Sequence, residues 1–154
     1  MKKELCLILP NIRSCHNVGS MFRTADGFGV SKIYLAGYTA EPPKPQIDKV
    51  SLGAEKWIPW EKVEDLGLSI SELKEKGVKI VGLEKTDESI EIRNLKFEIW
   101  DSDIALIVGN EVGGLDDETL ALCDEVVHIE MHGKKESLNV SVACGIALYE
   151  LSRK

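Results

Sequence analysis

Apolar residues along the chain form two kinds of pattern, and the two kinds alternate. Short continuous apolar runs predict buried β-strands at 5–9, 32–36, 78–83, 104–108 and 126–129. Helical spacing of apolar residues predicts helices from residue 17 to the glycines at 27 and 29, at 70–76, at 116–122 and at 140–151. This alternation predicts an α/β fold, with a mainly parallel sheet and helices on both faces.

Two segments have weaker patterns. Residues 37–60 are irregular because Pro42-Pro43-Lys44-Pro45 disfavours regular structure, although a short helix over 46–52 and a brief edge strand over 57–60 fit the residues around it. Residues 84–103 are acidic and predict a loop with one short helix. Neither segment contains a repeat or a low-complexity tract.

The length and composition indicate one ordinary globular domain over residues 1–154. No apolar run approaches the roughly 20 residues that span a bilayer. The first residues lack the pattern of a signal peptide, so we expect a cytoplasmic protein. The four cysteines form no C-x-x-C pair and stand at no zinc spacing with histidine, which predicts free thiols and no metal site.

The net charge of −7 is unevenly distributed. Residues 1–60 hold eight Lys/Arg and five Asp/Glu, residues 61–130 hold seven and nineteen, and residues 131–154 hold four and two. The two end segments are therefore mildly basic and could face an anionic partner despite the acidic total. The alternative is a solvated acidic face without a partner.

Two polar loops at the ends of predicted strands have candidate chemistry. Asn17 is a good N-cap for the first helix, and Arg23 lies away from that helix's apolar stripe, where it could reach into a cleft and bind phosphate or an oxyanion. The alternative for Arg23 is an ordinary surface arginine.

The second loop is Gly109-Asn110-Glu111-Val112-Gly113-Gly114, where Gly109 would let backbone approach a ligand closely. The alternative is a tight turn with an exposed glutamate.

A third polar loop, residues 131–141, leads into the last helix. Ser137 or Asn139 could be the N-cap of that helix, but a cap alone does not explain so long a polar approach between two buried elements. The chain contains neither a G-x-x-x-x-G-K-[ST] nor a G-x-G-x-x-G motif, which removes the main support for a nucleotide hydrolase or a nicotinamide oxidoreductase.

Taken together and in order, the three loops resemble the motifs of the SPOUT superfamily of RNA methyltransferases, in its TrmH (SpoU) branch of ribose 2′-O-methyltransferases. The similar segments are Asn17 to Ala25, Ile107 to Leu115, and Ile129 to Ala143. The resemblance covers nearly the whole chain, and three ordered motifs are far more specific than any one of them.

The resemblance implies a C-terminal deep trefoil knot whose loops bind S-adenosylmethionine. The residues at the matching positions are Leu83, Glu84, Gly109, Ile129, Met131, Ser137 and Leu138. It also implies a homodimer whose interface involves the first and last helices, where the small residues Ala143, Gly145 and Ala147 would permit close approach. No metal is required.

The resemblance further assigns catalysis to Arg23, with Asn17, Glu111, Ser137 and Asn139 shaping the site. We expect Arg23 to stabilise the forming alkoxide and to bind a neighbouring phosphate, because a guanidinium scarcely deprotonates. RNA would contact basic residues on the dimer surface, here Arg13, Arg23, Lys44, Lys49 and Lys134, with Lys56 and Lys135 as further candidates.

The expected activity is 2′-O-methylation of a ribose in RNA, with tRNA preferred and rRNA as the close alternative. Two readings from other classes stay open. One is a catalytically idle RNA-binding or assembly protein with the same fold, and the other is an α/β enzyme that acts on a small nucleotide-like substrate.

Overall fold

The computed structural model describes residues 2–153 and contains one sheet in which all paired strands are parallel. The strands are β1 (Leu5–Pro10), β2 (Lys32–Ala36), β3 (Trp60–Val63), β4 (Lys79–Leu83), β5 (Ile90–Glu91), β6 (Ile104–Val108) and β7 (Glu125–His128). The α-helices are α1 (Cys15–Gly27), α2 (Pro45–Ser51), α3 (Leu66–Glu75), α4 (Phe97–Trp100), α5 (Asp117–Leu122) and α6 (Val140–Leu151), and the short 3-10 helices are η1 (Ala54–Lys56) and η2 (Ile92–Asn94). This confirms the predicted α/β class.

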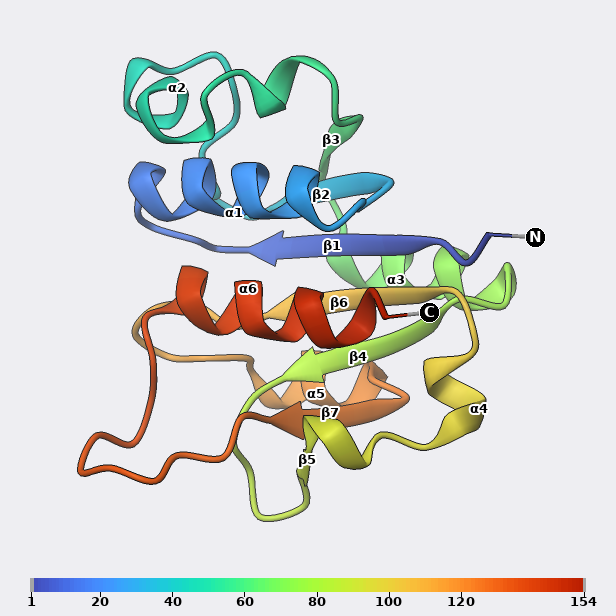
Figure 1. Cartoon of the computed structure of the whole chain (residues 1–154). Helices are drawn as coiled ribbons and strands as arrows, with labels where there is room; N and C mark the ends of the chain where they lie inside the picture. The colour runs from blue at the N-terminus through green and yellow to red at the C-terminus, as the bar shows by residue number, and fades with distance from the viewer. Residues whose placement is uncertain (1, 154) are drawn as a thin grey trace.

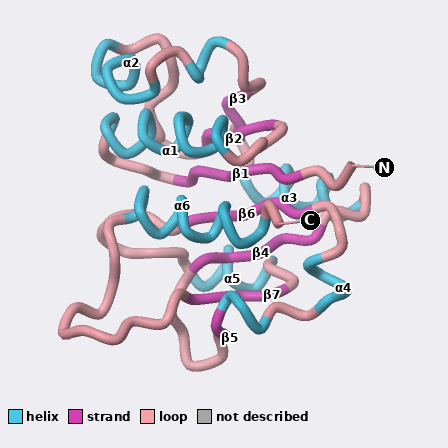
Figure 2. Tube along the Cα trace, in the orientation of Figure 1, coloured by secondary structure: helices cyan, strands magenta, loops and turns pink. Residues whose placement is uncertain are grey.

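The strand order is β3-β2-β1-β6-β4-β7-β5, so β1 and β6 lie in the interior of the sheet (Figures 1 and 2). Alternate residues of these strands point to opposite faces. Leu7 and Leu106 join the core under α1 and α6, whereas Ile8 and Ile107 join the core under α3 and α5. Continuous apolar runs are therefore needed here because both faces of each strand are covered.

Helices α1 and α6 lie side by side over one face of the sheet (Figure 1). The predicted stripe of α1 is fully buried, as are Cys144, Ala147, Leu148 and Leu151 of α6. The side chains of Val140 and Ala143, at the start of the α6 stripe, are only partly buried. That turn of α6 therefore lies at the boundary of the core.

The structure corrects several predicted boundaries. The N-cap of α1 is Ser14, whose side chain accepts a hydrogen bond from the Asn17 backbone N–H at 3.1 Å, so Asn17 lies inside the first turn. The edge strand predicted at 57–60 is present but lies three residues later, as β3 at the edge of the sheet. Pro59 has no N–H to donate to a ladder, and β3 begins after it at Trp60.

Two further segments differ from prediction in extent. Helix α3 begins at Leu66, four residues before the predicted start, because the Asp65 side chain caps the Leu68 N–H at 3.0 Å. The acidic segment 84–103 holds η2 and the short edge strand β5 in addition to the one short helix predicted there, α4. No helix among residues 2–153 is long and apolar enough to cross a membrane.

Candidate functional site

A cavity of about 390 Å³ lies at the carboxyl edge of the sheet, where β4, β6 and β7 end and α6 begins. The strand arrowheads in Figure 1 point to this edge, and the loop before α6 extends beyond it. The volume is within the range of roughly 300–1,000 Å³ that is typical of small-molecule sites. The cavity is lined by Leu83, Glu84, Lys85, Val108, Gly109, Asn110, Glu111, Val112, Gly114, His128, Ile129, Met131, Glu136, Ser137, Leu138, Asn139, Val140 and Ala143.

All seven residues predicted to bind cofactor line this cavity, and so do Glu111 and Asn139. Asn17 is not in the lining but contacts it through hydrogen bonds. Arg23 is exposed on α1 and does not line the cavity of its own chain. The prediction that Arg23 reaches into a cleft therefore does not hold for this cavity within a single chain.

Glu111 connects the second polar loop to the first. Its carboxylate accepts hydrogen bonds from the backbone N–H groups of Arg13 and Ser14, both at 2.9 Å, and from the Asn17 side chain at 3.0 Å. Burial alone would raise the pKa of the Glu111 carboxyl, but these donors together lower the pKa below its usual value. Glu111 is thus an ionised anchor for the chain that enters α1.

Asn139 connects the third loop to the same cluster. Its side-chain N–H lies 3.4 Å from the Asn17 side-chain oxygen, while its own oxygen accepts from the Ser141 N–H at 2.8 Å. That second bond makes Asn139 the N-cap of α6, one of the two caps expected there. Because the cap fixes which amide atom is oxygen, the N–H must point toward Asn17. Glu111, Asn17 and Asn139 therefore form one chain of hydrogen bonds across all three loops.

The loop after β6 is held by close backbone packing. A Cβ on Gly109 would lie 2.8 Å from the Gly114 Cα, and a Cβ on Gly114 would lie 2.0 Å from a Glu84 carboxylate oxygen. Glu84 accepts from the Leu115 N–H at 2.7 Å. The folding of its own loop is thus enough to require a glycine at position 109.

Lys85 and His128 are among the cavity residues that sequence reasoning did not assign to the site. The Lys85 Nζ lies 3.3 Å from one ring nitrogen of His128, and the Ser89 hydroxyl lies 2.8 Å from the other. Both residues stand at the carboxyl ends of strands, β4 and β7, which was the signal that could have found them.

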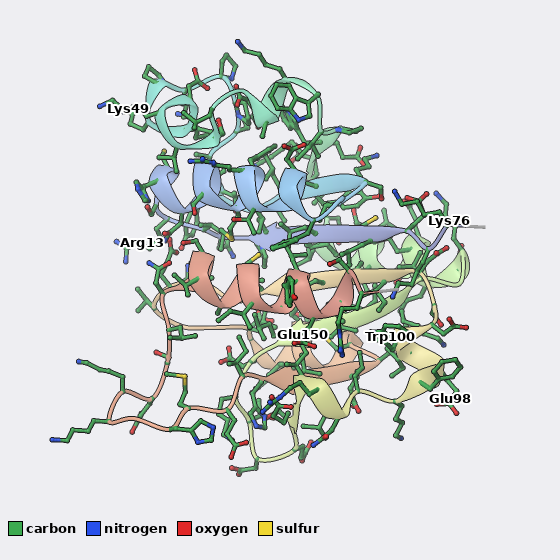
Figure 3. The ribbon with its side chains drawn as sticks, in the orientation of Figure 1. Arg13, Lys49, Lys76, Glu98, Trp100 and Glu150 are labelled. Carbon is green, nitrogen blue, oxygen red and sulfur yellow. The ribbon has the colours of Figure 1, made fainter. Side chains whose placement is uncertain are left out.

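The predicted RNA-binding residues Arg13, Arg23, Lys44, Lys49 and Lys134 are all exposed. Figure 3 shows Arg13 and Lys49 on the side of the molecule to which the loop before α6 also extends, opposite Lys76 and Glu98. Two of the predicted RNA-binding residues thus lie on the side of the molecule where the strands end, although the chain as a whole is acidic. Residues 2–153 contain no group of three or more His, Cys, Asp or Glu side chains arranged to hold a metal ion.

Helices α1 and α6 leave an apolar face uncovered. Val142, Ile146 and Tyr149 repeat at helical spacing on α6 and are 50%, 39% and 57% exposed. Phe28 packs its ring edge against Tyr149, with ring centroids 5.6 Å apart. Since Val140 and Ala143 line the cavity, the same turn of α6 contacts the cavity on one side and the apolar face on the other.

The SpoU rRNA Methylase family model matches residues 4–149 of this chain. A tRNA (guanosine(18)-2′-O)-methyltransferase from Aquifex aeolicus is 36% identical over 154 residues, covering 99% of this chain and 71% of that protein. The 23S rRNA (guanosine-2′-O-)-methyltransferase RlmB from Coxiella burnetii is 39% identical over 151 residues, covering 97% of this chain and 58% of that protein.

The crystal structure of an AdoMet-bound rRNA methyltransferase from Sinorhizobium meliloti superposes with a TM-score of 0.89 at 28% identity. The match covers 98% of this chain and 56% of that one. The chain therefore spans only part of each of these three proteins, 71%, 58% and 56% of their respective lengths.

Proposed function

The chain belongs to the SpoU rRNA methylase family, and on that premise we propose that it transfers a methyl group from S-adenosylmethionine to a ribose 2′-hydroxyl of RNA. The observation that carries the proposal is the hydrogen-bonded chain Glu111–Asn17–Asn139, which draws three distant loops around one cavity. We expect tRNA as the substrate, with rRNA as the alternative, since relatives of both kinds are similar along nearly the whole chain.

The cavity suits S-adenosylmethionine in size and in chemistry. Leu83, Ile129 and Leu138 offer apolar surface for the flat adenine ring, and the surrounding loops offer backbone N–H and C=O groups. When bound, S-adenosylmethionine supplies a sulfonium methyl group that a ribose oxygen can displace. The residues of this chain hold and shield the reacting groups, and alignment of the attacking oxygen provides much of the rate.

The roles of the polar residues follow from their positions. Glu111 is fully engaged with three donors, so it positions Asn17 and the start of α1 and is not a free base. Asn139 fixes the start of α6 beside Ser137, which faces the cavity. Arg23 supplies a permanent positive charge that stabilises a developing alkoxide and binds a neighbouring phosphate.

The active form is a homodimer formed through the apolar face of α1 and α6. Exposed apolar side chains at 142, 146 and 149 favour a protein partner over water, and the face adjoins the cavity through a single turn of α6. At 100° per residue, Arg23 is about 60° from Ser20, which lines this face. A partner chain docked there would bring its own Arg23 to the cavity, which Arg23 does not reach within one chain.

Further parts of the proposal rest on the family alone. The segment between β7 and α6 forms the deep trefoil knot, residues 1–154 form a single methyltransferase domain, and the protein works in the cytoplasm. The basic residues Arg13, Lys44, Lys49 and Lys134 contact the RNA backbone. Binding should therefore weaken as the salt concentration rises.

The direct test is binding of S-adenosylmethionine by calorimetry, followed by transfer of a tritiated methyl group to total tRNA and, separately, to total rRNA. Nuclease digestion of the labelled RNA should release a 2′-O-methylated nucleoside. Tight cofactor binding without transfer to either RNA would support the idle RNA-binding alternative. Transfer to free nucleosides would support the small-substrate alternative.

A complementation experiment tests the dimer and the origin of Arg23 together. Arg23→Ala removes the guanidinium and Leu138→Trp fills the cavity, so each variant alone should be inactive. If Arg23 acts on the partner's cavity, a refolded one-to-one mixture should regain about a quarter of wild-type activity, because half of the dimers are mixed and each has one intact site. No recovery in a mixture that is shown to contain mixed dimers would place Arg23 in its own chain's site.

A further inference from the structure

Tyr38, in the turn after β2, is an exposed aromatic residue attached directly to the wall of the cavity. The residue is 59% exposed. Its hydroxyl accepts a hydrogen bond of 2.7 Å from the side-chain N–H of Asn110, and Asn110 lines the cavity. A single hydrogen bond therefore links an exposed aromatic residue to the wall of the candidate active site.

The Tyr38 side chain is held at both ends. Its backbone N–H donates to the Asn11 side chain at 3.1 Å, and the next residue, Thr39, is 2% exposed and donates its hydroxyl to the Leu9 carbonyl at 2.7 Å. At the far end, the Asn110 oxygen accepts from the Val112 N–H at 2.7 Å, so the Asn110 N–H must face the tyrosine. The ring is consequently fixed before any ligand arrives.

A fixed and exposed aromatic ring has a specific use beside a ribose-modifying site. Proteins that read unpaired RNA stack its splayed bases on aromatic side chains. A ring that is already held in place loses less conformational entropy when a base stacks on it. Arg13, which is exposed and follows the same edge of the sheet, adds a cation that could hold the adjoining phosphate. Arg13 is two residues after Asn11, whose side chain accepts from the Tyr38 N–H, and an aromatic ring and a cation on one segment would suit the base and the phosphate of a nucleotide.

We propose that Tyr38 stacks on a nucleobase of the RNA substrate, at or next to the nucleotide whose ribose is methylated. This inference rests on the proposed function and adds to it the class of substrate. The modified nucleotide would lie in an unpaired stretch such as a loop, because a base inside a continuous helix has no free face to offer. The Asn110 tether would keep that base in a fixed relation to the cavity.

The first experiment compares methyl transfer to total tRNA and total rRNA by wild type, Tyr38→Ala, Tyr38→Phe and Phe97→Ala. Phe97 is a matched control, since it is 68% exposed but lies in α4, at the other edge of the sheet (Figure 1). Loss of a stacked base should lower kcat/KM of Tyr38→Ala by about 5- to 150-fold, which corresponds to 1–3 kcal/mol. Tyr38→Phe keeps the ring but loses the bond to Asn110, so its kcat/KM should lie between those of Tyr38→Ala and wild type, and Phe97→Ala should match wild type.

The second experiment separates stacking from a general loss of structure. We would measure binding of a 12-nucleotide oligo(A) and of a 12-unit abasic ribose-phosphate chain, with calorimetry of S-adenosylmethionine on the same samples. Wild type should prefer oligo(A), Tyr38→Ala should lose that preference, and abasic and cofactor binding should not change. Equal oligo(A) binding by wild type and Tyr38→Ala would overturn the inference even if methyl transfer by Tyr38→Ala were lowered. A wild-type protein that transfers no methyl group to any RNA would instead overturn the proposed function.

Discussion

Replacing Glu111 by glutamine tests whether the connection between the three loops depends on a carboxylate. One carboxylate oxygen accepts from the backbone N–H of Arg13, and the other accepts from the backbone N–H of Ser14 and from the side-chain amide of Asn17. Glutamine has the same shape, but its amide nitrogen would replace one oxygen and point N–H groups at an N–H donor. Either orientation therefore loses at least one hydrogen bond and adds a repulsive contact.

The size of the effect follows from these bonds. A hydrogen bond to a charged group contributes about 1.5–3 kcal/mol when it is buried. Glu111 is exposed, so water replaces part of what is lost and the estimate falls to about 1–2 kcal/mol. For a protein of this size each kcal/mol lowers Tm by roughly 2–4 °C, so we expect a decrease of about 2–8 °C. Methyl transfer should fall further, because Asn17 and the start of α1 lose their anchor.

The pH dependence has a definite sign. Since folding lowers the pKa of Glu111, its contribution to stability is present above the carboxyl's ordinary pKa and is lost as the pH falls through the lowered value. The stability difference between wild type and Glu111→Gln should therefore be largest at neutral pH. It should shrink in acid, below the ordinary range for glutamate.

The assay is urea unfolding of both proteins at pH 7 and at several acidic pH values, together with methyl-transfer rates at pH 7. Glu136→Gln is the matched control, because Glu136 also lines the cavity and is exposed. That variant should unfold like wild type. If Glu111→Gln were as stable and as active as wild type at pH 7, the anchoring role of Glu111 would be wrong.

Three further predictions test separate features. Gly109→Ala should lower stability by about 1–3 kcal/mol through overpacking against Gly114. Gly113→Ala is the control and should leave stability unchanged, because its added Cβ meets nothing within 4 Å. Equal urea midpoints for the two variants would refute this prediction. Arg23→Ala should abolish methyl transfer and leave S-adenosylmethionine affinity nearly intact by calorimetry, and near-normal turnover would remove Arg23 from catalysis. Burial raises the pKa of Cys144 to about 12 and that of Cys123 to about 11. At pH 8, Cys15 should therefore react with a thiol reagent before either of them. Equal labelling rates of the three cysteines, measured by mass spectrometry, would contradict this prediction.

The fold could be predicted where a local pattern was sufficient. Continuous apolar runs identified β1, β4 and β6 because a strand covered on both faces has no polar alternation to obscure it. The start of α3 was placed too late because Gly67 in its first turn disfavours a helix, although Leu66 continues the apolar spacing of Ile70 and Leu73. The start of α1 was misplaced by three residues because two good capping side chains, Ser14 and Asn17, compete in sequence and only the backbone geometry at Ser14 decides between them. Local patterns thus locate elements well and their ends poorly.

The site could be predicted only as far as parallel topology allowed. Leu83, Gly109 and Ile129 follow strands that end at one edge, so a shared cavity was a reasonable expectation before any coordinates. The sequence could not show that Glu111 bonds backbone N–H groups 97 and 98 residues away, since hydrogen bonds between distant loops leave no periodic signal. The proposed role of Arg23 in the cavity of a partner chain has the same origin. A single chain specifies a helix face but not the partner that would cover it, so a residue proposed to act across an interface is one that a single sequence, or a single protomer, leaves apart from the site.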